Sequence, residues 1–588
     1  MATQAGEVLG NGMSAALSYR RNSTYSRRAA LRLAALGGTF ALGVAGGCGG
    51  SGKRGAGRGG TPAPSPAGGV LTPEPGGEGE ANGRPGGTLT LAMPGVPPSL
   101  DPVAQNLALL PPFLALACNG LLAPANGRAL AADPAGTSLM PDLAAALPEQ
   151  PDATTYVFHL RKEARWQQTA PVGGRPFTAA DVQQHFSRAL GSRSALKAML
   201  APLERVEAVD DQTVRFVLKS VYAPFLTMIA GGEQRFVLPR ELAQAGVPRG
   251  TLAGTGPFAL AKHAPGETAS FSRNAAYWRR DGRGGALPYL DGISWLPLPD
   301  AAARVQALQA KRAQLCAAFD PASAEQLRAS NPNDYEFEEA PGVSDALYMR
   351  VDTPPFNDRR VRQALSLALD RPALIQALGK GHGAADLPVP AFLNVPAPPN
   401  GAGQPGRLLQ RDVQAARQLL AAAGIEEGLQ TTLTFTAQYG PAFVQEAALL
   451  RTQLHEAGVE AAPHQVDYAT YLSTAFVGKF DGLALGQRQI HPDADPYLSD
   501  LYVPGAIGYQ DGSNDAALQA LIAKQRAALD AAARAALLGQ IQAYLVEAAY
   551  RVYPPAIGRI YARAKTVRNW RASIWPSCAA LETTWLQP

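Results

Sequence analysis

Residues that could perform catalytic or metal chemistry are few in this chain of 588 residues, and their spacing matches no catalytic or metal site. The seven histidines form no H-E-x-x-H sequence and no other i, i+4 pair, the spacing that binds zinc on a helix. No G-x-S-x-G sequence marks a nucleophilic serine. The four cysteines also lack metal-ligand spacing; they are Cys48, Cys118, Cys316 and Cys578. We therefore predict that the protein is not an enzyme and needs neither a metal nor a cofactor.

One glycine-rich stretch, Gly47–Lys53, has the G-x-x-x-x-G-K pattern with which phosphate-binding loops begin. The next residue is Arg54, whereas such loops place a serine or threonine there to bind magnesium. No strand pattern precedes the stretch and no helix pattern follows it, so the sequence offers no helix N-terminus for a phosphate. We expect no nucleotide site here.

The sequence around Cys48 is instead typical of lipid attachment. Arg27 and Arg28 stand before the mildly apolar stretch Leu33–Gly47, and a basic segment followed by an apolar one is typical of a secretory signal peptide. The adjacent arginines resemble the twin-arginine export signal. Small residues end the apolar stretch directly before Cys48, as in a bacterial lipobox.

These features predict that residues 1–47 are a twin-arginine signal peptide with a lipobox, and that Cys48 becomes the lipid-carrying first residue. An ordinary signal peptide with an incidental cysteine is the alternative, and Met13 is an alternative start. The mature protein is then exported and lipid-anchored, in the periplasm or at the outer face of the cell membrane. Residues 48–86 are mostly Gly, Pro, Ser and Ala, a composition that predicts a flexible linker between this anchor and a folded body.

The overall composition indicates a globular protein and argues against a nucleic-acid partner. Hydrophobic residues make up 46% of the chain and charged residues 17%, which is enough to build large cores. The formal net charge is +5, but residues 1–47 contain five arginines and a single acidic residue. The remaining chain is therefore close to neutral and lacks the clustered basic residues of a nucleic-acid surface.

Hydrophobic periodicity predicts an α/β fold with regular strand–helix alternation in the C-terminal half. Alternating apolar residues predict strands in the first half at 88–93, 156–160 and 213–218. A capping box from Thr178 to Asp181 begins a helix between the last two strands. In the second half, helices are expected from Asp358 and at 413–423, 443–457, 468–477 and 515–548, and strands at 432–436, 459–466 and 480–485. This order favours a lobe with a partly parallel sheet.

Several short motifs add a resemblance to this pattern. They include Phe177–Asp181 (FTAAD), Gly254–Phe258 (GTGPF), Pro288–Asp291 (PYLD) and Pro355–Ala364 (PFNDRRVRQA). Together with others along residues 86–588, these motifs resemble, in type and order, those of the family 5 extracellular solute-binding proteins. This family comprises the dipeptide- and oligopeptide-type receptors of bacterial ABC importers.

The resemblance implies an α/β, two-lobed, periplasmic-binding-protein-like (Venus flytrap) fold with an extra subdomain in the first lobe. The expected segments are 87–130, 250–345 and 545–588 for lobe I, 131–249 for the extra subdomain, and 346–544 for lobe II. The chain would then cross between the lobes near Asp345 and Val546. A ligand that bridges both lobes shifts the population toward the closed form by its higher affinity for that form.

The implied function is that of a substrate-binding lipoprotein, expected to act as a monomer. It would capture a small solute, expected to be a di- or oligopeptide, and deliver it to the permease and ATPase subunits of an ABC importer. A closed cleft can hold a peptide by main-chain hydrogen bonds. The alternatives are a non-peptide cargo, a ligand-presenting signalling adaptor with the same fold and, more remotely, a secreted hydrolase.

Peptide-binding relatives pair a carboxylate with the amino terminus of the cargo, in a loop that follows a Trp and ends in Asp-Pro. The corresponding stretch here is Gly486–Pro496, in which the Trp is missing. Asp495 fits the end of this loop, and the expected ligand carboxylate falls at or beside Asp493. Gln487 and Arg488 stand near its start, and the positive charge of Arg488 leaves an acidic or non-peptide cargo open.

Three further residues are expected at strand or loop ends that face the predicted cleft. They are Asn119, Tyr348 and Arg350, which complete a ligand-binding set with the four polar residues of the loop. Gly254–Phe258 is expected to form a structural turn near the hinge rather than to contact the cargo.

Overall fold

The computed structural model of the chain describes residues 83–104, 109–125, 133, 137–192, 197, 199–232, 235–264, 267–319, 321–401, 403–506, 508–573 and 581–588. The predicted signal peptide, Cys48, most of the predicted linker and Cys578 lie outside the described residues. Within the described residues the chain is a mixed α/β protein, as predicted, and its larger sheets belong to separate hydrophobic cores.

The first sheet has seven strands drawn from distant parts of the sequence, in the order β12-β18-β11-β1-β10-β9-β8. The strands are β1 (Thr88–Met93), β8 (Phe258–Ala264), β9 (Thr268–Arg273), β10 (Gly292–Pro297), β11 (Leu315–Phe319), β12 (Tyr335–Ala340) and β18 (Arg559–Ala564). The central strand β1 runs parallel to both neighbours, β10 and β11, and the remaining pairs are antiparallel. The sheet therefore joins three of the segments that the sequence assigned to lobe I.

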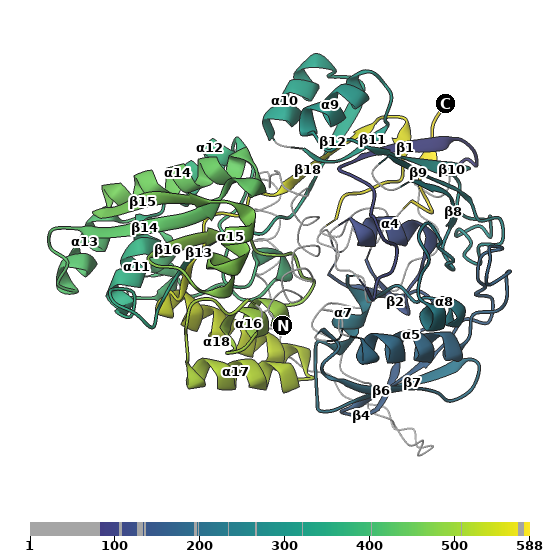
Figure 1. Cartoon of the computed structure of the whole chain (residues 1–588), viewed down its shortest axis with the longest axis horizontal. Helices are drawn as coiled ribbons and strands as arrows, with labels where there is room; N and C mark the ends of the chain where they lie inside the picture. The colour runs from purple at the N-terminus through teal and green to yellow at the C-terminus, as the bar shows by residue number, and fades with distance from the viewer. Residues whose placement is uncertain are drawn as a thin grey trace, which may run out of the picture.

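Both faces of this sheet are covered, because apolar side chains on its central strand point to opposite sides. Leu89 and Leu91 of β1 pack in a core with α4 (Leu110–Ala117), whereas Ala92 packs with α9 (Ala301–Gln309) and α10 (Pro321–Ser330) on the other face. Figure 1 shows α9 and α10 above this sheet and α4 below it.

A four-stranded antiparallel sheet forms a separate layer beside the first sheet, in the order β4-β5-β7-β6. Its strands are β4 (Glu149–Asp152), β5 (Thr155–His159), β6 (Leu203–Ala208) and β7 (Thr213–Leu218). It packs against α5 (Ala179–Gly191), α7 (Phe225–Ala230) and α8 (Arg240–Ala245), and a short pair, β2 (Leu122–Pro124) and β3 (Leu139–Pro141), lies beside it. All of these elements except β2 fall within the predicted extra subdomain.

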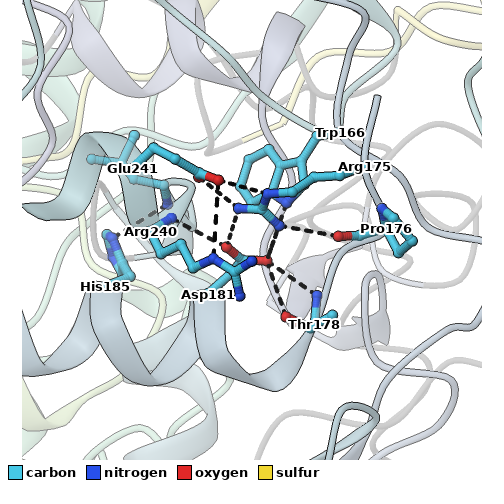
Figure 2. A network of polar contacts seen from close by, with 9 residues as sticks. Trp166, Arg175, Pro176, Thr178, Asp181, His185, Arg240 and Glu241 are labelled. Atoms are coloured by element: carbon cyan, nitrogen blue, oxygen red, sulfur yellow. Dashed lines mark hydrogen bonds and ion pairs between the residues drawn. The ribbon is translucent and has the colours of Figure 1, made fainter. Parts of the chain in front are cut away.

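The capping box that begins α5 also organises a polar network in this layer. The Asp181 carboxylate, fully buried, accepts hydrogen bonds from Trp166 Nε1 at 3.1 Å and from the backbone N–H groups of Thr178 and Arg240, both at 3.1 Å. The Arg175 guanidinium donates to Asp181 at 2.6 and 2.9 Å and to Glu241 at 2.6 and 2.8 Å (Figure 2). One buried carboxylate thus ties together α5, α8 and the loop before α5.

The second large sheet has five strands in the order β15-β14-β16-β13-β17. They are β13 (Ala346–Met349), β14 (Leu429–Thr436), β15 (Val459–Val466), β16 (Leu483–Gly486) and β17 (Arg551–Val552). Strand β14 is parallel to β15 and β16, whereas β13 is antiparallel to β16 and β17. The prediction of a partly parallel sheet is therefore confirmed.

The helices around this sheet begin mostly where the sequence places an N-cap aspartate. Asp358, Asp370 and Asp412 each accept a backbone N–H within the first turn of the helix that follows. These helices are α11 (Arg359–Ala368), α12 (Arg371–Gly379) and α13 (Val413–Ala422); they are followed by α14 (Pro441–Glu456), α15 (Tyr468–Ser473), α16 (Asp495–Tyr502), α17 (Ala516–Ala527) and α18 (Ala531–Ala548).

Two predicted helices are interrupted in the structure. The helix expected at 468–477 ends at Ser473, because Thr474 leaves helical geometry (φ −121°, ψ −86°), and a 3₁₀ turn continues at Ala475–Val477. The single helix expected at 515–548 is two helices, α17 and α18. Ala528 is extended (φ −84°, ψ 97°) and the Asp530 side chain caps the second helix by accepting from Ala533 N.

The return of the chain from the second sheet to the first comes later than predicted. Lobe I was expected to resume at residue 545, with a crossing near Val546. Helix α18 instead continues to Ala548, and β17 at Arg551–Val552 pairs with β13 of the second sheet. The chain therefore leaves the second sheet after Val552 and enters the first at Arg559. The other expected boundaries stay predictions.

The Gly254–Phe258 motif lies where two backbones approach too closely for any side chain. A Cβ at Gly254 would lie 1.7 Å from the carbonyl oxygen of Ala117, and one at Gly256 would lie 2.5 Å from the carbonyl carbon of Ala117. The buried Gln167 side chain donates to the carbonyls of Ala117, Gly256 and Phe258 at 2.9–3.2 Å. These contacts are those of a structural turn.

Two features are not found among the described residues. No helix in this part of the chain is long and apolar enough to cross a membrane. Nor do any three His, Cys, Asp or Glu side chains there gather in a way that could hold a metal ion.

A buried histidine next to the network of Figure 2 makes stability depend on pH. His185 is fully buried, its Nδ1 accepts the Leu238 N–H at 3.3 Å, and Arg188 and Asp101 are the charged groups near it. Burial, with a smaller contribution from Arg188, lowers the pKa of His185 from 6.5 to about 4. Between pH 6.5 and pH 4 the unfolded chain therefore binds a proton at His185 that the folded protein does not bind. The free energy of unfolding falls as the pH drops through this range.

We predict that His185→Gln reduces this loss of stability, because glutamine can accept the same N–H and does not titrate. The free energy of unfolding of the wild type should drop between pH 7 and pH 5 by about 2 kcal/mol more than that of the variant. Urea unfolding at pH 7 and pH 5 measures the difference, and the exposed His159→Gln is the matched control. Equal pH dependence in the wild type and His185→Gln would contradict the prediction.

Candidate functional site

The loop that the sequence singled out begins beside the point where the chain passes between the two large sheets. Strand β16 ends at Gly486, which pairs with Ala346, the first residue of β13. The two crossing segments, 341–345 and 553–558, lie close together, since a Cβ at Gly342 would lie 2.4 Å from the Ile557 carbonyl oxygen. Residues 487–494 therefore start at the hinge between the sheets and end directly before Asp495, the first residue of α16.

Arg488 is a buried clamp at this hinge. Its side chain is 1% exposed and pairs with Asp386 at 3.2 Å. The guanidinium also donates to Ser344 Oγ at 3.1 Å and to the carbonyls of Leu387 and Pro388 at 3.1 and 2.5 Å. In this arrangement Arg488 holds the loop, the first crossing segment and residues 386–388 together. Its positive charge is neutralised by Asp386 inside the protein.

His491 lies between the two charged residues of the loop. Its backbone N–H donates to the Tyr497 hydroxyl at 2.8 Å, and its ring meets the ring of Tyr497 edge-on at 5.3 Å between centroids. Burial and the nearby Arg488 lower the pKa of His491 to about 4, with Asp493 acting in the opposite direction. The imidazole is therefore neutral near pH 7.

Asp493 forms an ion pair with α18. Its two carboxylate oxygens accept from the Arg534 guanidinium at 2.5 and 2.8 Å, and Oδ1 also accepts the Asp495 N–H at 2.7 Å. The Asp493 side chain is 11% exposed and that of Arg534 is 4% exposed. Because burial strengthens the attraction between opposite charges, the negative charge of Asp493 is largely neutralised inside this lobe.

Asp495 connects the second lobe to the layer of β4 to β7. Its carboxylate is almost fully buried and accepts from Gln525 Nε2 at 2.7 Å and Arg526 Nε at 3.0 Å, both at the end of α17. The Tyr222 hydroxyl, from the loop between β7 and α7, donates to the other oxygen at 2.9 Å. Burial raises the pKa of Asp495, an effect that Arg526 opposes and Asp493 reinforces.

The remaining predicted residues lie in different surroundings. Tyr348 is buried in β13, with the Arg551 guanidinium 4.8 Å from its ring centroid. Arg350 pairs with Asp352 and donates to the Gly478 carbonyl. Asn119 is buried and donates to Asp142 Oδ1 at 2.9 Å while it accepts from Thr255 Oγ1 at 3.2 Å. Gln487 is half-buried at the start of the loop.

The structure thus brings Arg488, Asp493 and Asp495 onto one hinge-side loop, whereas Asn119 belongs to the first half of the molecule. The side chains that hold this loop were not predicted from the sequence; they are Tyr222, Gln525, Arg526 and Arg534. Tyr222 is 273 residues from Asp495 along the chain, so no local pattern could have linked them. Contact with a ligand stays a prediction for all seven residues.

We predict that Asp493→Ala destabilises the fold, because it leaves the buried Arg534 guanidinium without its carboxylate. Removing one partner of such a pair should lower the free energy of unfolding by about 3–5 kcal/mol. Urea unfolding measures this loss. The matched control is Asp352→Ala, whose side chain is 40% exposed and whose pair with Arg350 lies near the surface; it should cost no more than about 1 kcal/mol. A stability equal to that of the wild type would show that Asp493 is not structural.

Comparison with known proteins agrees with this architecture. A family model described as bacterial extracellular solute-binding proteins, family 5 Middle, matches residues 138–509. The dipeptide-binding protein of Escherichia coli (strain K12) is 28% identical over 403 residues, which cover 64% of this chain and 72% of that protein.

Solved structures show the same fold. The periplasmic binding protein DppA from Helicobacter pylori, in complex with the peptide STSA, superposes with a TM-score of 0.69 at 23% identity over 87% of this chain and 100% of its own. The binding protein AgaA from A. tumefaciens R10, in complex with agropinic acid, has a TM-score of 0.68 at 24% identity over 85% of this chain and 99% of its own.

The matched family covers more than half of the chain, and the fold of its structures is the one described above. Members bind solutes outside the cell for ABC transporters and are not enzymes. The chain belongs to the bacterial extracellular solute-binding proteins of family 5.

Proposed function

We propose that the protein is the lipid-anchored receptor of an ABC importer, and that it captures a short peptide between its two lobes for delivery to the permease. The observation that carries the proposal is the position of the loop 487–495. It starts at the hinge, beside both crossing segments, and ends at a contact with the opposite half of the molecule. A solute bound along this loop would be enclosed when the two halves approach each other.

The peptide assignment is supported by the relatives. Three relatives from E. coli and Pseudomonas aeruginosa, whose matches cover 64% to 74% of this chain, are named as dipeptide- or di/tripeptide-binding proteins. We propose that Gln487, Arg488, Asp493 and Asp495 shape the site from lobe II. Arg488 and Asp495 act by fixing the loop, since both are almost fully buried.

Asp493 has the exposure to meet the cargo, but its charge is already paired with Arg534. An amino group that approaches this carboxylate gains less than it would from an unpaired one, because the nearby guanidinium repels it. This pairing favours a second candidate, a cargo without a free amino group. The structure of AgaA with agropinic acid shows that a protein of this fold can bind a solute other than a peptide.

Native mass spectrometry of the protein purified from its own host tests the cargo class directly. We expect retained ligands with the masses of short peptides. A retained compound that is not composed of amino acids alone would contradict the peptide assignment and support the second candidate. The receptor function would still hold.

We further predict that N-acetylation of a bound peptide costs less than about tenfold in affinity, equal to about 1.4 kcal/mol. The reason is the internal pairing of Asp493 with Arg534. Calorimetry with the peptide identified by mass spectrometry, with and without an N-acetyl group, measures the difference. A loss of a hundredfold or more would show that the amino group is recognised by a charged partner.

The lipid anchor has its own test at Cys48. The wild type should fractionate with membranes and should carry an acylated Cys48 as its first residue, seen in the mass of its N-terminal peptide. Cys48→Ser should lose the acyl mass and leave the membrane fraction, with unchanged unfolding by urea because Cys48 lies before the folded body. Membrane association that persists in Cys48→Ser would argue against the lipobox.

A further inference from the structure

A small contact between protein groups joins the two halves of the molecule. Tyr222 and Ala223, between β7 and α7, meet Asp495 and Arg526 at the ends of α16 and α17. In Figure 1, α16 and α17 lie on the side of the second lobe that faces α7. We call these four residues the lobe contact.

Two hydrogen bonds and a stacked ring make up the lobe contact. The Tyr222 hydroxyl donates to Asp495 Oδ2 at 2.9 Å, and the Ala223 N–H donates to the Arg526 carbonyl at 2.7 Å. The Arg526 guanidinium lies 5.2 Å from the centroid of the Tyr222 ring. Tyr222 is 8% exposed and Asp495 1% exposed, so water has little access to the bond between them.

The partners of Asp495 divide unequally between the two halves. Gln525, Arg526 and Ser499 belong to the same lobe as Asp495 and stay beside it whatever the lobes do. Tyr222 alone comes from the other half among the donors to this carboxylate in the described residues. Separation of the lobes therefore breaks the Tyr222 and Ala223 bonds and exposes a previously buried carboxylate to water, while the rest of the network remains.

We propose that Tyr222 is a positioning residue for cargo binding, which stabilises the closed arrangement of the lobes through Asp495 and Arg526 without touching the cargo. The inference rests on the proposed function. A cargo that binds the closed form has an apparent affinity proportional to the fraction of molecules in that form. A contact that raises this fraction tightens binding of every cargo by the same factor.

Tyr222→Phe tests the inference, because it removes the hydroxyl and keeps the ring on which Arg526 lies. The matched control is Tyr289→Phe, which removes a hydroxyl that donates to Asp281 Oδ2 at 2.8 Å within one lobe. Without ligand, hydrogen exchange at the Ala223 amide should be faster by about tenfold in Tyr222→Phe, and X-ray scattering should give a larger radius of gyration. Tyr289→Phe should match the wild type in both measurements.

Binding supplies the second readout, with the dipeptide Met-Leu as the probe in calorimetry. We expect Tyr222→Phe to bind Met-Leu five- to twentyfold more weakly than the wild type and Tyr289→Phe to bind it equally well. Unchanged exchange and scattering in Tyr222→Phe would overturn the lobe contact. More open lobes with unchanged Met-Leu affinity would overturn the positioning role.

The two proposals fail in different ways. If the wild type does not bind Met-Leu, Met-Leu is not a cargo. Faster hydrogen exchange at Ala223 and a larger radius of gyration in Tyr222→Phe would still support the lobe contact. In that case native mass spectrometry measures how fast the cargo retained from the host dissociates. Equal dissociation rates in the wild type and Tyr222→Phe would overturn the positioning role.

Discussion

The burial of the Arg488 guanidinium is the constraint on which the hinge and the candidate binding loop both depend. A buried charge is tolerated only when it is paired and hydrogen-bonded. Here the partners come from Ser344 in one crossing segment and from Asp386 to Pro388, while the ring of Tyr553, in the other crossing segment, lies 4.4 Å from the guanidinium carbon. Arg488 therefore ties the loop 487–494 to both crossing segments of the hinge.

The acidic residues near Arg488 are likewise paired with opposite charges, and this pairing limits which cargo the loop could attract. Asp386, Asp493 and Asp495 each have an arginine from another element as a partner, namely Arg488, Arg534 and Arg526. The loop contains several charges but presents little net charge. A cargo held against this loop, as proposed, would be distinguished mainly by hydrogen bonds and shape, because an internally neutralised site offers no strong field to a charged terminus.

Local patterns in the sequence were sufficient to predict several of the elements but not the partners across the fold. Alternation located β1, β5 and β7, the N-cap Asp358 located the start of α11, and an apolar stripe located α13. The break between α17 and α18 was missed because Ala528 continues an apolar helical pattern, although Asp530 is itself a capping residue. The loop Gly486–Pro496 was found by resemblance, but the arginine and tyrosine partners of its carboxylates lie 31 to 273 residues away and leave no periodic signal.

The position of Asp495 gives the loop and the lobe contact a common element. Asp495 is the first residue of α16, and its N–H donates to Asp493 Oδ1 at 2.7 Å. Its carboxylate accepts a hydrogen bond from the Tyr222 hydroxyl. If the proposed site is correct, a cargo that orders the turn at Asp493 would also order the carboxylate that accepts from the Tyr222 hydroxyl. Because free-energy coupling between two sites is reciprocal, the contribution of the lobe contact to cargo affinity equals the contribution of the cargo to closure at this contact. Under the proposed function, this hydrogen-bonded turn would connect capture of a solute beside the hinge with approach of the lobes.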